Sequence, residues 1–300
     1  MERRLSYGRA GFALQFLLDT SLADGDKYPL KIRDLIVMSL NPTMGNTKLV
    51  WANDPAIVIN DLPNVALTGD KYHRPMWRSE EMAEYTGAVM FIDPSGRGAD
   101  ETGYAVTKHL MGNIFLMDAG GSRGGYSPEA LEALAQLAKV NRVKLIQVES
   151  NFGDGMFTEL LKPVLMRIYP CTVEEVRATG QKELRIIDTL EPVMSTHRLI
   201  VDQKLIEKDY QTSQTDMKYG LFYQMTRITK DRGALIHDDR LDAVEGAVRY
   251  WTKSMARDNE KDNLKARDKL VVQDLKQFAK HVFGKHKPAK LNWGQARRND

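Results

Sequence analysis

The fold of this chain is decided by Ala88-Val-Met-Phe-Ile-Asp93, a short apolar run of strand length that ends in a carboxylate. Two more strand patterns follow at residues 103–107 and 113–117, separated by turn-prone residues. A helical pattern then leads to Val143-Lys-Leu-Ile-Gln-Val-Glu149, a second apolar run that ends in a carboxylate. We therefore expect an antiparallel meander of three strands, then a helix, then a fourth strand beside the first.

The predicted helices are marked by the residues that open them. Ser127 offers an N-cap and Pro128 fits the first helical position, so the apolar stripe that follows predicts a helix to about Val140. Later elements are predicted as a helix opened by Gly153-Asp-Gly155, a strand over 172–177, a helix over 184–197 and a last helix from about His237 to Trp251. The predicted class is α/β: a mixed sheet with antiparallel strands 1–3 and flanking helices.

The patterns divide the chain into three parts. Residues 1–86 show a short helical pattern at 8–18 and a candidate strand at 31–38, and the prolines that follow predict an extended linker or arm. Residues 87–252 carry the predicted domain. Residues 253–300 hold thirteen Lys or Arg against six Asp or Glu, which predicts a basic C-terminal helix and tail. Such a tail suits a phosphodiester substrate, and a solvated charged helix explains it equally well.

Composition excludes several classes of protein. With 300 residues and 42% hydrophobic content, the chain is long enough to bury a sizeable core. Its single cysteine, Cys171, excludes an intramolecular disulfide and a zinc cluster built on cysteines. The apolar stretch over residues 12–19 is too short to span a bilayer and lacks a cleavage site. We expect a folded, non-exported protein without a membrane partner.

Carboxylates end the two apolar strands and open the last helix. Asp93 and Glu149 end the strands, and Asp238, Asp239 and Asp242 fall in the first turn of the helix. Hydrolysis of a phosphodiester by two metal ions needs carboxylates from different elements close together, and Mg²⁺ or Mn²⁺ prefers oxygen ligands. If the two strands lie side by side, these acids meet at one edge of the sheet. Taken singly, each acid also fits a plain role as a turn residue, an edge charge or a helix cap.

Other catalytic patterns are weaker. The pair Gly284-Lys285 is followed by His286 and lacks the upstream glycine of a phosphate-binding P-loop. The glycine-rich residues 120–125 could touch a phosphate through backbone amides, but such a stretch is more often a flexible loop. Asp118 also ends an apolar strand pattern, so a carboxylate in that position is not unique in this chain. The sequence therefore carries no ATPase signature.

Three segments resemble the nuclease motifs of large terminase subunits, the DNA-packaging proteins of tailed phages. Phe91-Ile-Asp-Pro-Ser-Gly-Arg-Gly-Ala-Asp-Glu-Thr102 resembles the first motif, Gln147-Val-Glu-Ser-Asn-Phe-Gly-Asp-Gly155 the second, and His237-Asp-Asp-Arg-Leu-Asp-Ala243 the third. Residues 8–16 and 28–31 are similar to the region that follows the packaging ATPase in T7-like phages. The resemblance covers nearly the whole chain.

This resemblance implies an RNase H-like endonuclease that cuts concatemeric double-stranded DNA during genome packaging with two Mg²⁺ or Mn²⁺ ions. Because no P-loop is present, we expect the C-terminal portion of such a subunit, with ATP bound only in the absent N-terminal portion. By motif match, Asp93 and Glu149 are metal ligands, and Asp93 bridges both ions. For the third position the match favours Asp239 with Asp242 in support, and Asp238 is a helix cap or a further ligand.

The resemblance also implies partners and a location. The partners are DNA, the portal ring and the small terminase subunit, in the host cytoplasm and not in the mature virion. Candidate contacts to the DNA backbone are Arg97, Arg123 and the tail from Lys253, although each also fits a solvated surface charge. Two alternatives stay open: another RNase H-like nuclease such as a junction resolvase, and a non-catalytic module that docks on the portal or the small subunit.

Overall fold

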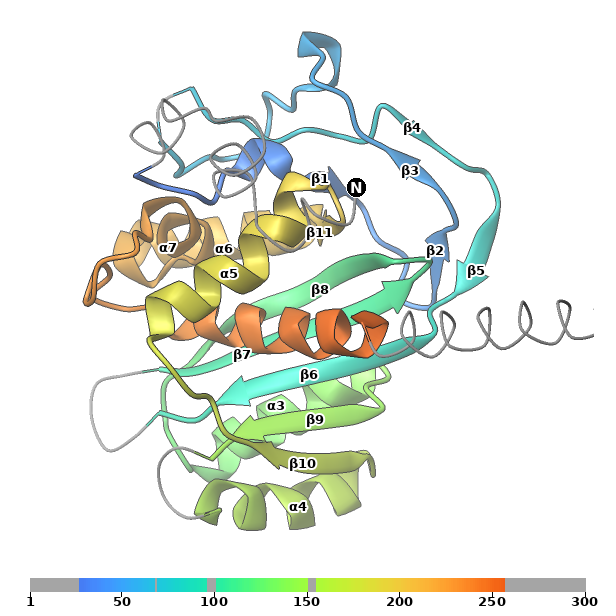
Figure 1. The fold of residues 1–300 in the computed structure, drawn as a ribbon. Helices are drawn as coiled ribbons and strands as arrows, with labels where there is room; N and C mark the ends of the chain where they lie inside the picture. Colours follow the sequence, from blue (N-terminus) through green and yellow to red (C-terminus); the bar gives the residue numbers. More distant parts are fainter. Residues whose placement is uncertain (1–26, 68, 96–100, 151–154, 257–300) are drawn as a thin grey trace, which may run out of the picture. The chain divides into compact units, whose positions relative to one another are not determined.

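A seven-stranded mixed sheet forms the centre of the computed structural model, which describes residues 27–67, 69–95, 101–150 and 155–256 (Figure 1). The strand order is β1-β11-β8-β7-β6-β9-β10. The strands are β1 (Ile36–Met38), β6 (Gly87–Asp93), β7 (Thr102–Leu110), β8 (Asn113–Ser122), β9 (Leu145–Glu149), β10 (Thr172–Val176) and β11 (Leu199–Asp202). The chain divides into two units at Thr252 and Lys253, and the sheet lies in the first.

The strand pairing confirms the predicted meander. β6, β7 and β8 are antiparallel neighbours, and β9 lies parallel to β6 on its other side. The β6 residues from Ala88 to Ile92 are buried on both faces, which explains why their sequence is a continuous apolar run and does not alternate. The predicted α/β class with a mixed sheet is therefore correct.

Helices cover both faces of this sheet (Figure 1). α3 and α4 pack on one face, and α5 and the helical residues 239–252 lie over the other. The helices are α3 (Pro128–Val140), α4 (Met156–Ile168), α5 (Lys182–Ser195), α6 (Gln203–Thr215) and α7 (Leu221–Arg227), with the short turn η4 (Met217–Tyr219) between the last two. Within the described residues, no helix is both long and apolar enough to cross a membrane.

Helix α3 begins where the sequence predicts it. The Ser127 hydroxyl accepts a hydrogen bond from the Ala130 backbone N–H at 3.2 Å, and Pro128 occupies the first helical position. An N-cap of this kind satisfies a backbone donor that the helix cannot pair internally. The buried Leu131 and Leu134 then pack in the same core cluster as Ile92 of β6.

The described part of residues 1–86 is not the extended linker that its prolines predict. β1 is an edge strand of the main sheet and pairs in parallel with β11, and Ile36 and Val37 are each only 1% exposed. The predicted strand over residues 31–38 is correct only in its last part, because η2 (Ile32–Asp34) turns the chain first. The carboxylate of Asp70 holds that turn by accepting from Ile32 N and Arg33 N. The predicted helix over residues 8–18 lies outside the described residues.

Two small antiparallel sheets of two strands each follow β1 and pack against the main sheet. Their elements are β2 (Met44–Asn46), β3 (Leu49–Val50), η3 (Pro55–Ile57), β4 (Trp77–Arg78) and β5 (Met82–Glu84), with β2 paired to β5 and β3 to β4. Lys108 of β7 is only 2% exposed and anchors this region. Its ammonium donates to the Pro42 carbonyl and lies 5.3 Å from the centroid of the Tyr85 ring. Burial lowers the pKa of Lys108 to about 8.

Candidate metal centre

Asp93 and Glu149 end two neighbouring parallel strands. β6 pairs with β9 in the register Ile92↔Val148, so the next residue of each strand is one of these two acids. Directly opposite residues share one face of a sheet. The two carboxylates therefore leave the sheet at the same edge and on the same face, as the element order predicts.

The third carboxylate comes from the last helix. Carboxylate oxygens of Asp93, Glu149 and Asp242 all lie within 4.8 Å of one another. The helix start reaches the sheet over Gly103, where an added Cβ would lie 2.3 Å from the Asp239 carbonyl oxygen. Gly103 is paired with Asp93 across β6 and β7, so this close approach brings the helix directly over the strand end.

Asp238 and Asp239 lie near this group but are not part of it. Oδ1 of Asp238 accepts a hydrogen bond from Lys182 Nζ at 2.8 Å. Asp239 contributes to the field that raises the pKa of Asp93. Side chains on a helix lean toward its N-terminus, so the acid one turn into the helix lies over the strand ends. Of the three acids that the sequence offers for the third position, Asp242 is therefore the one whose carboxylate meets those of Asp93 and Glu149.

Two cations from α5 lie against these acids, and no motif in the sequence predicts either of them. Lys182 Nζ lies 3.1 Å from Oδ2 of Asp242, and Arg185 Nη2 lies 2.9 Å from its Oδ1. A lysine at the start of a helix opposes the helix dipole, which favours acids at that end. That unfavourable placement is the one local signal that a nearby anion holds Lys182.

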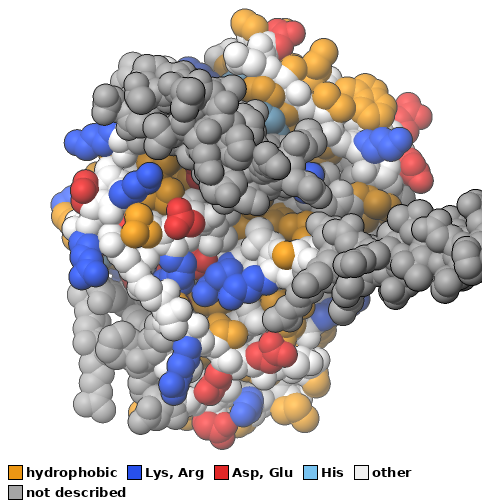
Figure 2. Space-filling model, in the orientation of Figure 1, with side chains coloured by type: hydrophobic (Ala, Val, Ile, Leu, Met, Phe, Trp, Pro, Cys, Tyr) orange, Lys and Arg blue, Asp and Glu red, His pale blue; other side chains and the backbone are white. Residues whose placement is uncertain are grey.

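The charge network continues from Arg185 into the protein. Its Nη1 lies 2.9 Å from Oε2 of Glu245, a side chain with no exposed surface. The Thr189 hydroxyl donates to Oε1 of Glu245 at 2.8 Å, and Arg249 Nε lies 3.1 Å from the same oxygen. Arg185 is therefore fixed from behind while it faces Asp242. Figure 2 shows Lys and Arg side chains gathered between α5 and the helical residues 239–252.

Burial and mutual repulsion shift the titration of the acids. Burial, followed by the charges of Asp242, Glu149 and Asp239, raises the pKa of Asp93 well above its usual value, against the opposing effect of Lys182. Burial and Asp242 likewise raise the pKa of Glu149, whereas Arg185 and Lys182 act to lower it. A cluster of this kind holds excess negative charge that a bound cation would relieve.

The candidate DNA contacts are placed differently. Arg123 follows β8 at the same edge of the sheet as the acids and has a side chain that is 60% exposed. Lys253 is exposed and belongs to the second unit of the chain. Arg97 lies outside the described residues.

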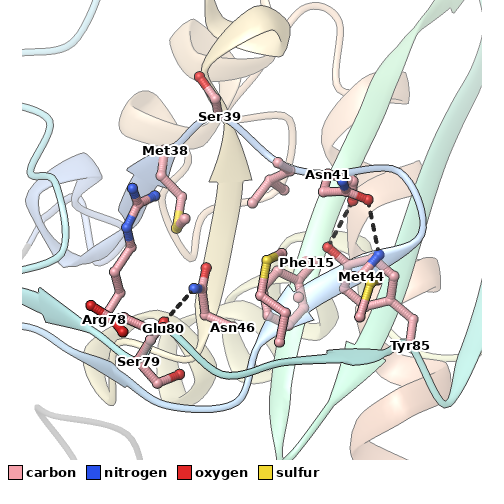
Figure 3. Close-up of a pocket in the computed structure, with 13 residues that line it drawn as sticks. Met38, Ser39, Asn41, Met44, Asn46, Arg78, Ser79, Glu80, Tyr85 and Phe115 are labelled. Atoms are coloured by element: carbon pink, nitrogen blue, oxygen red, sulfur yellow. Dashed lines mark hydrogen bonds between the residues drawn. The ribbon is translucent and has the colours of Figure 1, made fainter.

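Two cavities in the described part of the chain lie away from the acids. One of about 550 Å³ opens beside β1, β2 and β5 (Figure 3). Met38, Met44 and Phe115 give it apolar walls, and Asn46 lies among them with its amide bound to the Ser79 carbonyl at 2.7 Å. No acid of the cluster lines it, so it is a separate feature from the candidate metal centre.

Comparisons with known proteins agree with this architecture. A family model described as Terminase Bacteriophage T7, Ribonuclease H-like domain, matches residues 92–199. The terminase large subunit of Enterobacteria phage T3 is 45% identical over 285 residues, which are 93% of this chain and 48% of that protein. The chain thus spans about half the length of this curated relative.

Solved structures show a more distant likeness. The human cytomegalovirus terminase nuclease domain is 14% identical with a TM-score of 0.40, covering 55% of this chain and 82% of that one. The large terminase nuclease of the thermophilic phage G20c is 11% identical with a TM-score of 0.40, covering 73% and 96%. Likeness at this level carries no argument about the site. The family follows instead from the 45% identity to the phage T3 protein and from the matched RNase H-like domain: this chain belongs to the large terminase subunits of T3- and T7-like phages.

Proposed function

We propose that this chain is a divalent-metal-dependent endonuclease that hydrolyses phosphodiester bonds of double-stranded DNA. The observation that carries the proposal is the convergence of Asp93, Glu149 and Asp242 within 4.8 Å, from two strands and a helix far apart in sequence. Membership of the terminase family supports the same reading. Of these three acids, Asp242 is the one that forms ion pairs with Lys182 and Arg185. The pKa values of Asp93 and Glu149 stay raised, so a cation-binding role explains the convergence better than a structural one.

The residues present fit a hard divalent cation. All three groups are carboxylates, the donor type that Mg²⁺ and Mn²⁺ prefer, and burial keeps the pKa of Asp93 and Glu149 raised until a cation compensates them. When bound, a pair of such ions would polarise the attacking water and neutralise the leaving oxygen. Asp93, Glu149 and Asp242 would hold the ions, and Arg185 fixes the orientation of Asp242 from behind.

The biological setting of the proposal comes from the family. We assign to this nuclease the cutting of concatemeric DNA during genome packaging, in the host cytoplasm, together with the portal ring and the small terminase subunit. ATP would be bound by the half of the relatives that this chain does not span. Little base reading is expected, because cutting at the end of packaging needs contacts to the DNA backbone more than to base edges.

Cleavage of a supercoiled plasmid by the purified chain tests the proposal. Nicking should require Mn²⁺ or Mg²⁺, stop in EDTA and be lost in Asp93→Asn. Asp118→Asn is the matched control, because Asp118 is an acid of the same sheet whose carboxylate pairs with Lys208, outside the cluster. Nicking by Asp93→Asn at the wild-type rate would refute the assignment.

Plasmid nicking, together with partner binding and cleavage of a four-way junction, separates the rival functions. A docking module would show no metal-dependent nicking in the wild-type chain, while partner binding would survive in Glu149→Gln. A junction resolvase would cut a four-way junction in strong preference to a linear duplex. A packaging nuclease should cut both substrates at similar rates, since its contacts are to the backbone.

A further inference from the structure

Three side chains stack beside the acid cluster. The guanidinium carbon of Arg123 lies 4.5 Å from the centroid of the Tyr219 ring. That ring stacks on His237, with centroids 3.9 Å apart and planes inclined by 19°. His237 directly precedes Asp238, where the segment that carries Asp242 begins. The stack therefore connects an arginine at the end of β8 with the segment that places the third acid.

The guanidinium of Arg123 is bound to the protein through Nε, and much of the side chain is exposed to solvent. Its Nε lies 3.2 Å from Oε1 of Glu101, a side chain that is only 4% exposed. The other carboxylate oxygen of Glu101 is bound by Arg240 at 2.9 Å, so Glu101 is held rigidly from the protein side. In the part of the chain that the structure describes, Arg123 makes its hydrogen bond through Nε, and its side chain is 60% exposed. Its Nη groups are thus available to a ligand in solvent.

The pairing of the strands gives the position of Arg123 relative to the metal centre. Asp93 is opposite Gly103, and Gly103 is opposite Gly121 on β8. Two strand spacings of ~4.8 Å and two further residues of ~3.3 Å each put the backbone of Arg123 roughly 12 Å from that of Asp93. Neighbouring phosphates of one strand are farther apart than their ~3.4 Å rise along the helix axis, so this separation corresponds to a few nucleotides at most.

We propose that Arg123 binds a backbone phosphate of the DNA strand that lies in the metal centre, a few nucleotides from the bond to be cut. This inference rests on the proposed nuclease function. A guanidinium offers paired N–H groups that match two phosphate oxygens. Stacking on Tyr219 and the bond to Glu101 hold the guanidinium in one orientation before DNA arrives, which reduces the ordering that binding must bring about.

Binding of a fluorescent DNA duplex in EDTA, measured by anisotropy across a series of salt concentrations, tests the inference without cleavage. Arg123→Ala should weaken binding by about tenfold, as expected for loss of one charge-assisted hydrogen bond. The slope of log K against log salt should fall by about 1, as expected for one lost phosphate contact. Tyr219→Leu should weaken binding and leave the slope unchanged, because it removes the stack but no charge.

Arg167→Ala is the matched control. Arg167 is 64% exposed and pairs with Glu132, so it resembles Arg123 in exposure and pairing but lies on α4. The DNA affinity of Arg167→Ala and the slope of its log K against log salt should equal those of the wild type. Mn²⁺ affinity of Arg123→Ala, measured by calorimetry, should also be unchanged, which separates a DNA contact from damage to the metal centre.

A wild-type salt slope in Arg123→Ala, or absence of DNA binding by the wild-type chain in EDTA, overturns the inference. Failure of the nuclease proposal appears separately, as metal-dependent nicking by Asp93→Asn.

Discussion

Arg185 Nη2 lies 2.9 Å from Oδ1 of Asp242, so a guanidinium of the protein already faces the acid that we assign as the third metal ligand. The same guanidinium binds Glu245, and all three side chains are largely buried. A buried charge that loses its partner is much less stable than an intact pair. The site is thus a charge network in which each member depends on the others.

Arg185→Gln should lower the free energy of unfolding by about 3 kcal/mol in EDTA, because it removes the cation that the buried Asp242 and Glu245 share and leaves each acid with one ion pair in place of two. Urea denaturation measures the loss. Adding Mn²⁺ should restore part of it, since a bound cation would compensate Asp242. The double variant Arg185→Gln/Glu245→Gln should lose less than the sum of the single variants, and simple additivity would contradict the network. Arg167→Gln, which alters an exposed ion pair, should change stability by less than ~1 kcal/mol.

Asp242→Asn should abolish Mn²⁺ binding, whereas Asp238→Asn should retain it. Among the described residues, Asp242 is the acid that brings an oxygen within 4.8 Å of both Asp93 and Glu149, and the carboxylate of Asp238 binds Lys182 outside this group. Calorimetric titration with Mn²⁺ compares the two variants directly. Asp239→Asn should weaken binding mildly through the lost negative charge. If Asp239→Asn removes binding and Asp242→Asn keeps it, the third ligand is wrongly assigned.

Asp93→Asn should make the metal-free protein more stable than the wild type, and this difference in the free energy of unfolding should grow as the pH rises. The pKa of Asp93 is raised in the folded state, so this carboxyl contributes stability that is present below its unfolded pKa and is lost as pH rises through the folded pKa. The amide of the variant does not titrate, so the variant does not lose this stability. Urea denaturation in EDTA should give similar stabilities at acidic pH and a growing advantage for Asp93→Asn toward neutral pH. A stability difference that stays constant across the pH range would show that the pKa of Asp93 is not shifted.

Lys108→Met should change the response of stability to alkaline pH. The folded pKa of Lys108 is about 8, against 10.5 for an ordinary lysine, so between these values the unfolded chain binds more protons. Stability of the wild type should therefore rise relative to the variant as pH increases from about 8 to 10.5. Urea denaturation across that window measures the difference. Lys139→Met, at an exposed position of α3, should show no such trend.

The sequence was sufficient wherever structure depends on neighbouring residues. The apolar runs that end in Asp93 and Glu149 are buried strands, and the element order was enough to predict that β6 and β9 lie together. The cap at Ser127 also acts locally. These features are determined within short segments, so a pattern of a few residues specifies them.

Features that depend on residues far apart in the sequence could not be predicted from local patterns. β1 is a strand because β11, more than 160 residues later, pairs with it, and the intervening prolines suggest a linker instead. The choice between Asp239 and Asp242 depends on how closely the helix approaches Gly103, which no local pattern encodes. Lys182 and Arg185 become part of the site only through the packing of α5 against the last helix.

The edge position of β1 determines how tension would enter this protein. A pull on the chain ahead of residue 27 would act along β1, whose parallel pairing with β11 would then be loaded in shear, so that its hydrogen bonds resist together and not one after another. The hydrogen bonds from Ile32 and Arg33 to Asp70 lie ahead of β1 and would take up load first. Three strands, β11, β8 and β7, stand between β1 and β6. Mechanical work done on the chain at that end would therefore be spread across the sheet before it disturbs the strand that carries Asp93.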